Sequence, residues 1–313
     1  MKWIPKFSLR TLFILFAVIG AALTPIVLRM KHVQHQRDVA TWIMESGGTV
    51  YYESQYDDEG ELVEFEPSTP IWLQSILGVD FFEEIEGVIY LDNEVEDISR
   101  LSELTTLKSV FLKGTNVSDI SCLAQLRNLE MIHFRKNPVV EIPKLSDLKY
   151  LKHFAMMDSD VTGVANLEGM DSIEILDLSQ SPVADISELS TLINLKQLYL
   201  WKSKVTDLTP LANLGSLEKL SLTDTRVSDL EPLADLKSLE TLTVDETNVS
   251  DVSPLSNLKS LKRLHINETK VTNLAPLSNL SDLQYLIVSG ATVSQDQIEK
   301  IKVALPNCKV IVE

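Results

Sequence analysis

The sequence predicts an α/β repeat solenoid, a horseshoe with a parallel β-sheet on its concave face and short 3₁₀ or helical return segments, preceded by a transmembrane helix. Valine recurs at intervals of 22 residues from Val95 to Val293, and a fixed period of this length is typical of solenoids. Leucine stands six residues after each valine from Leu101 to Leu277, so the period is structural. An uncharged apolar run, residues 11–28, precedes the array.

The first 28 residues are predicted to be a basic tail (1–10) and a transmembrane signal anchor (11–28). Basic residues flank the apolar run on both sides: Lys2, Lys6 and Arg10 before it, and Arg29, Lys31 and Arg37 after it. A cleaved signal peptide and a buried soluble helix are the alternatives. No Ala-x-Ala cleavage site is present, which favours an uncleaved anchor, and charges at both ends disfavour a buried helix. The short basic tail favours a cytoplasmic N-terminus, hence a single-pass membrane protein with an extracytoplasmic repeat domain.

Residues 29–87 are predicted to form a juxtamembrane helix and an acidic junction that caps the repeats. A helix over 31–46 would place Val33, Ala40, Ile43 and Met44 on one face, with Gly47-Gly48 as its stop. A strand over 49–53, an acidic turn at 57–60 and a short helix over 71–77 should follow. The acidic spacing is not that of an EF-hand loop, which favours a solvated turn over a calcium site.

The repeats span residues 88–293, about nine units. Apolar residues fifteen and seventeen positions after each valine, such as Leu220 and Leu222, have period two and predict a short strand with one buried face. The Leu-x-x-Leu run has period near three and predicts a 3₁₀ or tight helical return path. Thr, Ser or Asn stands two residues before nearly every valine, where its side chain can bond the backbone turn of its own or a neighbouring coil.

The pattern LxxLxxLxxLxLxxTxVSDLxPL resembles the 22-residue class of leucine-rich repeats, shared by internalins and by a regulatory subunit of protein phosphatase 1. The whole layout also resembles bacterial membrane-anchored, internalin-like proteins, with the segment FSLRTLFILFAVIGAAL, a helix ending in Gly-Gly and a closing LPNCKV. Thr or Ser mostly replaces the usual ladder Asn. No cell-wall sorting motif is present, so the resemblance does not imply surface adhesion.

The last unit, residues 294–313, departs from the repeat and is predicted to be a C-terminal cap. Ser294 to Gln297 form a capping box for a helix that runs to about Leu305, and a final strand follows over 309–312. The two cysteines, Cys122 and Cys308, lie about eight and a half repeats apart, roughly 40 Å at the spacing of stacked strands, so we expect free thiols.

The chain carries a formal charge of −17, and residues 38–99 hold seventeen Asp/Glu and no Lys/Arg. Such a chain repels phosphate backbones, so we expect no nucleic-acid partner. The P-loop, GxSxG and HExxH motifs are absent, and we predict no catalytic residue, cofactor or metal site.

The sequence instead predicts a binding module that presents its concave face to a protein partner and is held in the membrane by residues 11–28. The face should be aromatic and basic in the first repeats, and hydroxyl-rich and acidic later. The candidate binding residues are Phe111, His133, Arg135, His153, Tyr199, Trp201 and Lys202. A regulatory subunit of a cytoplasmic enzyme such as a phosphatase is the first alternative, and an unrecognised enzyme is the second.

Overall fold

The computed structural model describes residues 9–52 and 78–312. The chain divides into two compact units, residues 1–86 and 87–313. The acidic turn expected at 57–60 and the short helix expected at 71–77 lie outside the described residues.

The first unit is built on one continuous helix, α1 (Leu9–Glu45), where the sequence predicted an apolar helix and a separate one over 31–46. Nothing between the two segments breaks the backbone, so they merge. Its apolar part contains an 18-residue window of mean hydropathy 2.5 with no part of it buried. This length and composition suit a membrane span, and a signal sequence has the same properties. The helix ends before Gly47, whose φ is +85°, and β1 (Gly48–Tyr52) follows.

The C-terminal half of α1 buries Val33, Ala40 and Ile43, as predicted. The assignment of Met44 to the same face was wrong, because its side chain is 55% exposed. Val39 is buried instead. At about 100° per residue, Met44 lies at the edge of the buried face, about 140° from Val39, and it is the last but one residue of the helix.

Acidic residues of the junction pair with the basic residues that follow the apolar run. Arg29 forms an ion pair with Glu84 and donates its Nε proton to the carbonyl of Phe81 at 2.8 Å, at the end of η2 (Val79–Phe81). Further along α1, Nε of Arg37 lies 2.6 Å from Oδ2 of Asp80. Glu84 and Asp80 therefore neutralise Arg29 and Arg37 of α1 within this unit.

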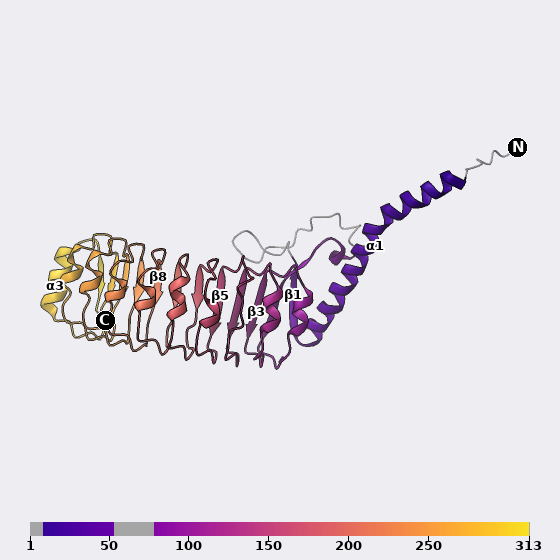
Figure 1. Cartoon of the computed structure of the whole chain (residues 1–313). Coiled ribbons are helices and arrows are strands. Elements are labelled where there is room, and N and C mark those ends of the chain that lie inside the picture. Colours follow the sequence, from indigo (N-terminus) through magenta and orange to yellow (C-terminus); the bar gives the residue numbers. More distant parts are fainter. Residues whose placement is uncertain (1–8, 53–77, 313) are drawn as a thin grey trace. The chain divides into compact units, whose positions relative to one another are not determined.

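The second unit is a stack of parallel strands in sequence order (Figure 1). From β2 to β11 each strand is shifted by 22 residues from the one before, and β12 is shifted by 24 from β11. This confirms the predicted fold class and register. The strands are β2 (Ile85–Leu91), β3 (Ser109–Lys113), β4 (Met131–Arg135), β5 (His153–Met157), β6 (Ile175–Asp177), β7 (Gln197–Tyr199), β8 (Lys219–Ser221), β9 (Thr241–Thr243), β10 (Arg263–His265), β11 (Tyr285–Ile287) and β12 (Lys309–Ile311).

The predicted 3₁₀ return path is also confirmed. The 3₁₀ segments are η3 (Ser99–Glu103), η4 (Ser121–Gln125), η5 (Ala165–Leu167), η6 (Ser187–Thr191), η7 (Thr209–Leu211), η8 (Glu231–Leu233), η9 (Ser253–Asn257) and η10 (Ala275–Asn279). Each lies between two consecutive strands.

One return path within the described repeats, between β4 and β5, has no 3₁₀ helix. In a typical unit the carboxylate of Asp207 accepts a hydrogen bond from the backbone N–H of Thr209 at 2.8 Å, which starts the turn. Pro143 occupies the position of Thr209 and has no N–H to donate. The turn therefore lacks this hydrogen bond, and Pro143 also disfavours the helical backbone for Ile142 before it. The second effect is needed, because η5 forms although Gly163 supplies no carboxylate.

The core is a set of leucine columns that no single coil could bury. In the coil of residues 205–222 the valine and all the leucines are at most 1% exposed: Val205, Leu208, Leu211, Leu214, Leu217, Leu220 and Leu222. Burying each large side chain is worth about 1.5–3 kcal/mol. Both neighbouring coils are needed for this burial, so stacking supplies the stability.

From Val117 to Val271 the residue two positions before each valine is polar and buried, and its side chain can bond the backbone as predicted. Nδ2 of Asn137 donates to the carbonyl of Leu112 in the preceding coil at 3.2 Å, and Oδ1 of Asn137 accepts from the hydroxyl of Thr115. In later coils the threonine serves its own turn, as where Thr225 donates to the carbonyl of Leu222 at 2.7 Å. In these later coils, where threonine replaces asparagine, the side chain no longer makes a hydrogen bond to the preceding coil.

A fixed position after each strand adopts a left-handed backbone, which the sequence did not predict. Two of these residues are glycines, Gly114 and Gly290. The others carry side chains, with φ from +46° to +60°: Asp92, Lys136, Asp158, Gln180, Lys202, Asp224, Glu246 and Glu268. The N–H of Glu246 still bonds the next coil, to the carbonyl of Asn267 at 2.8 Å. Stacking therefore imposes the strained conformation on residues that do not prefer it.

The helix and the strand expected in the last unit are present, with one change in the capping box. Helix α3 (Gln295–Ala304) begins after Ser294, whose side chain accepts a hydrogen bond from the N–H of Gln297. The side chain of Gln297 does not return this bond. It accepts from the N–H of Leu274, one coil earlier, at 3.2 Å, and so ties the cap to the last repeat.

The leucine columns predict that Leu211→Asp lowers the free energy of unfolding by about 4 kcal/mol or more, because it buries an unpaired charge. The matched change Lys219→Asp, on the exposed side of β8, should stay within about 0.5 kcal/mol. Thermal and denaturant unfolding of both variants would check this. Equal effects would show that the register is wrong.

The left-handed column predicts that Glu246→Val destabilises the protein by about 1–2 kcal/mol, because a β-branched residue resists positive φ. Glu246→Gly should be at least as stable as the native chain. Arg226→Val is the control, since Arg226 is equally exposed and has negative φ. If valine costs the same at both positions in denaturant unfolding, the left-handed backbone imposes no strain.

Candidate protein-binding face

The strand face consists of the side chains that point outward from the sheet, at the first, third and fifth positions of β3 to β5 and at the equivalent positions of later strands. Alternate residues of a strand point to opposite faces, so these side chains lie over the buried leucines. Because neighbouring strands are in register, residues 22 apart form columns along the face.

The first cluster on this face lies on β3 and β4. The rings of Phe111 and His133 stack with centroids 4.6 Å apart and planes 25° apart. Arg135, two residues further along β4, is exposed beside them. Burial lowers the pKa of His133, with a smaller lowering by Arg135 that Asp177 opposes. At neutral pH this cluster is therefore an aromatic pair with one fixed cation.

The second cluster lies at the end of β7. Tyr199 points outward, its hydroxyl donates to the side chain of Gln197 at 2.8 Å, and burial raises its pKa. Nζ of Lys202 lies 5.0 Å from the ring centroid of Trp201, a cation–π contact, and 3.9 Å from Asp224. Both rings are half-exposed. The cluster thus offers aromatic surface with a cation at its edge.

Small or short side chains separate the two clusters. Tyr199 and His133 lie in one column, with Asp177 and Ala155 between them. Three strand spacings amount to about 14 Å, so one partner can span both clusters. His153 begins β5, opposite Met131 and Ile175. The structure therefore places all the predicted residues on or beside one face, with His153 one column from the main pairs.

Two features of the strand face escaped sequence reasoning. Arg263 lies over the ring of Tyr285 at 5.4 Å, an aromatic–basic pair in repeats that were expected to be hydroxyl-rich and acidic. The 22-residue register was sufficient to find it, since the two residues occupy one column.

The second feature is a pair of side chains that form hydrogen bonds with the backbone of the next coil. Oδ1 of Asp245 accepts a hydrogen bond from the N–H of Asn267 at 2.7 Å, and Oδ1 of Asn267 accepts one from the N–H of Ser289 at 2.7 Å. Their role here is structural.

Two kinds of chemical site bear on catalysis in the described part of the chain, metal clusters and reactive cysteines. Within 9–52 and 78–312, no group of three His, Cys, Asp or Glu could hold a metal ion. Cys122 and Cys308 are free thiols, as predicted. Burial, with help from Asp119 and Asp97, raises the pKa of Cys122 to about 12, so its thiolate does not form at neutral pH.

Comparison with known proteins finds the same repeat fold. Residues 215–257 match the family model described as leucine-rich repeats (2 copies). No curated protein matches the chain. An internalin (inlF) from Listeria monocytogenes is similar, with 28% identity and a TM-score of 0.65; the match covers 71% of this chain and 66% of the internalin, just under two thirds. Internalin C2 from the same species has 25% identity and a TM-score of 0.53, covering 80% of this chain and 92% of that one.

Proposed function

Because the chain is a bacterial, internalin-like leucine-rich-repeat protein, we propose that it is a non-enzymatic module that binds a protein partner through its strand face. The observation that carries the proposal is the pair of aromatic–basic clusters about 14 Å apart on that face. Trp, Tyr and Arg are the residues most enriched at the energetic centres of protein interfaces.

The rigidity of the face supports this function. The side chains of both clusters stand on strands that are fixed by the stack on either side, so little conformational entropy is lost when a partner binds. Phe111 and His133 are already stacked, and Lys202 already lies beside Trp201. The face is therefore organised before the partner arrives.

The proposal also includes anchoring in the membrane by residues 11–28, with the repeats outside the cytoplasm. The support is the apolar part of α1 together with the basic tail before it. A regulatory subunit of a cytoplasmic enzyme would need the opposite orientation. Labelling a C-terminal tag in intact cells distinguishes the two, since the tag reacts from outside only in the proposed topology.

Affinity capture from a membrane extract tests the binding face. Trp201→Ala and Arg135→Ala should each weaken binding of the main captured protein by about 2 kcal/mol, roughly 30-fold in Kd. Thr243→Ala is the control, because Thr243 lies on the same face outside both clusters. If Thr243→Ala alters the captured set while the other two leave it unchanged, binding occurs in the C-terminal repeats and the proposed face is wrong.

Fractionation tests the anchor. The protein should stay in the membrane pellet after washing with alkaline carbonate, and mass spectrometry should find its N-terminus intact, because residues 11–28 provide a span and lack a clear cleavage site. Release by the wash, or a mature N-terminus near Leu23, would show a cleaved signal peptide instead.

A further inference from the structure

A second surface lies along the edge of the sheet where the strands begin. The residue directly before each strand donates its backbone N–H to the carbonyl of the equivalent residue in the preceding coil. The N–H of Glu174, for example, donates to the carbonyl of Lys152 at 2.9 Å. We call this column the entry edge; its residues are Lys108, Glu130, Lys152, Glu174, Lys196, Glu218, Glu240, Lys262 and Gln284. Charge alternates strictly from Lys108 to Glu218, and the alternation ends where Glu240 follows Glu218.

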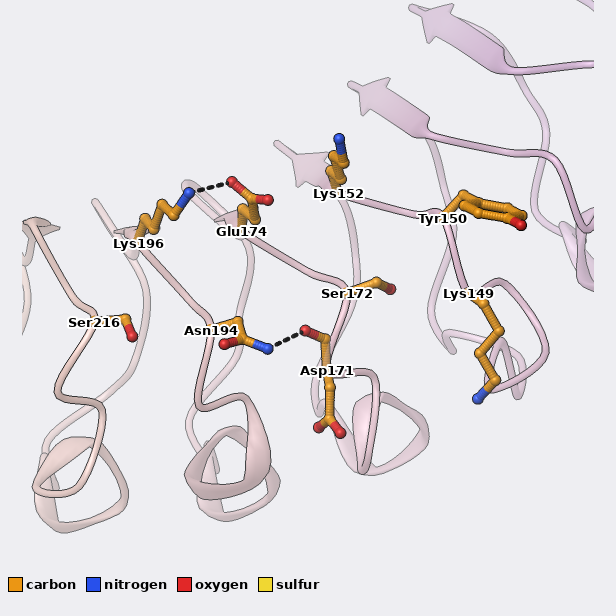
Figure 2. Close-up of a pocket in the computed structure, with 9 residues that line it drawn as sticks. All are labelled: Lys149, Tyr150, Lys152, Asp171, Ser172, Glu174, Asn194, Lys196 and Ser216. Carbon is orange, nitrogen blue, oxygen red and sulfur yellow. Dashed lines mark hydrogen bonds and ion pairs between the residues drawn. The ribbon is translucent and has the colours of Figure 1, made fainter.

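A hollow opens beside the middle of the entry edge (Figure 2). Tyr150 stands at one end of it with its side chain 61% exposed. The same position of the following coils holds Ser172, Asn194 and Ser216, which also line the hollow. One large side chain is thus followed by small ones, and the hollow is the space that they leave.

We propose that the entry edge binds a second copy of this chain, antiparallel to the first, about a two-fold axis that passes between Lys152 and Glu174. Each Lys152 then faces Glu174 of the second copy. Moving outward from the axis, Glu130 faces Lys196, and Lys108 faces Glu218. Every contact is made twice, as two-fold symmetry requires. The equal spacing of the strands, about 4.8 Å, keeps these pairs aligned along the whole contact.

The charge pattern selects this axis over its neighbours. An axis through a single coil would set Glu174 against Glu174, or Lys152 against Lys152. An axis one coil later, between Glu174 and Lys196, would bring Glu130 against Glu240. Within residues 108–218 the chosen axis gives three kinds of opposite-charge contact and no like-charge contact; the next pair outward, Glu86 with Glu240, is of like charge and marks the end of the contact. An axis one coil earlier, between Glu130 and Lys152, would set Arg127 against Lys149 in the adjacent column. Opposing like charges close to the axis therefore disfavour the other arrangements.

An adjacent column supports the same axis independently. Lys149 and Asp171 lie three residues before Lys152 and Glu174, and both are exposed. The proposed axis sets Lys149 of one copy against Asp171 of the other. It also sets Tyr150 against Ser172 of the second copy, at the hollow. The charges and the shape of this edge therefore point to one arrangement.

Ion pairs within one chain do not conflict with the contact. Nζ of Lys196 lies 2.7 Å from Oε2 of Glu174, and both side chains remain partly exposed at 46% and 34%. Exposed pairs of this kind contribute little to stability, so their groups can also contact charges of a second copy. The pair of Lys262 with Glu240 at 2.6 Å is of the same kind but lies outside the proposed contact, which makes it a control.

Zero-length carbodiimide cross-linking of the full chain in detergent tests the arrangement, using an equal mixture of unlabelled and ¹⁵N-labelled protein. Lys108 and Glu218 lie five strands apart in one chain, about 24 Å, too far for an internal link. We expect mixed-isotope links between Lys108 and Glu218 and between Lys152 and Glu174, and weaker association at 1 M salt than at 0.1 M. A monomer at 100 µM, or dimers linked only elsewhere, would overturn the proposal.

Charge reversal gives a second readout. Lys152→Glu should raise the dissociation constant of the dimer at least about tenfold, because it creates two like-charge contacts per dimer. The double variant Lys152→Glu/Glu174→Lys should restore association. Lys262 lies in the same column outside the proposed contact, and Lys262→Glu loses the ion pair with Glu240. This variant should dimerise like the native chain, with circular dichroism confirming that all variants fold. An equal loss of association for Lys152→Glu and Lys262→Glu, or no loss for Lys152→Glu, contradicts the proposed axis.

Discussion

The stacking of one coil on the next is the constraint on which the other features of the repeat domain depend. A coil of 22 residues cannot bury its leucines alone, and its strand has no partner within the coil. Contact with its neighbours satisfies both needs, since the leucine columns close and the backbone N–H and C=O groups pair along the sheet. The period of 22 follows from this requirement, because every coil must present the same groups at the same height.

Stacking also explains where the chain tolerates unfavourable local structure. Gln180 and Glu246 adopt a left-handed backbone that glycine would adopt more easily. Their N–H groups are nevertheless held in the ladder, by the carbonyls of Trp201 and Asn267. The loss of the 3₁₀ turn at Pro143 is tolerated for the same reason: Leu145 and Leu148 remain buried by their columns. Tertiary contacts thus override local preference in both places.

The sequence predicted features that repeat and missed those that depend on a single residue. The valine and leucine phases were sufficient to assign strands, buried columns and the outward direction of Tyr199 and Trp201. Periodicity could not show that Met44 lies outside the buried face of α1, because a helix face has a width that only its packing partner defines. The second bond of Gln297 was equally hidden, since it reaches the coil before it. The contact of Arg263 with Tyr285 could have been predicted from the 22-residue register, because the two residues lie 22 positions apart.

The core leaves the surface columns free to vary, and this freedom lets one solenoid carry two different surfaces. Side chains of the strand face project perpendicular to the sheet, whereas the entry edge lies at the strand ends. A partner on the strand face therefore leaves Lys152 and Glu174 accessible, and an edge contact leaves Arg135 and Trp201 accessible. Two copies joined at the entry edge would present two strand faces, so a partner with two binding sites would meet the second at a raised effective concentration. Self-association and partner binding would then reinforce each other without sharing a residue.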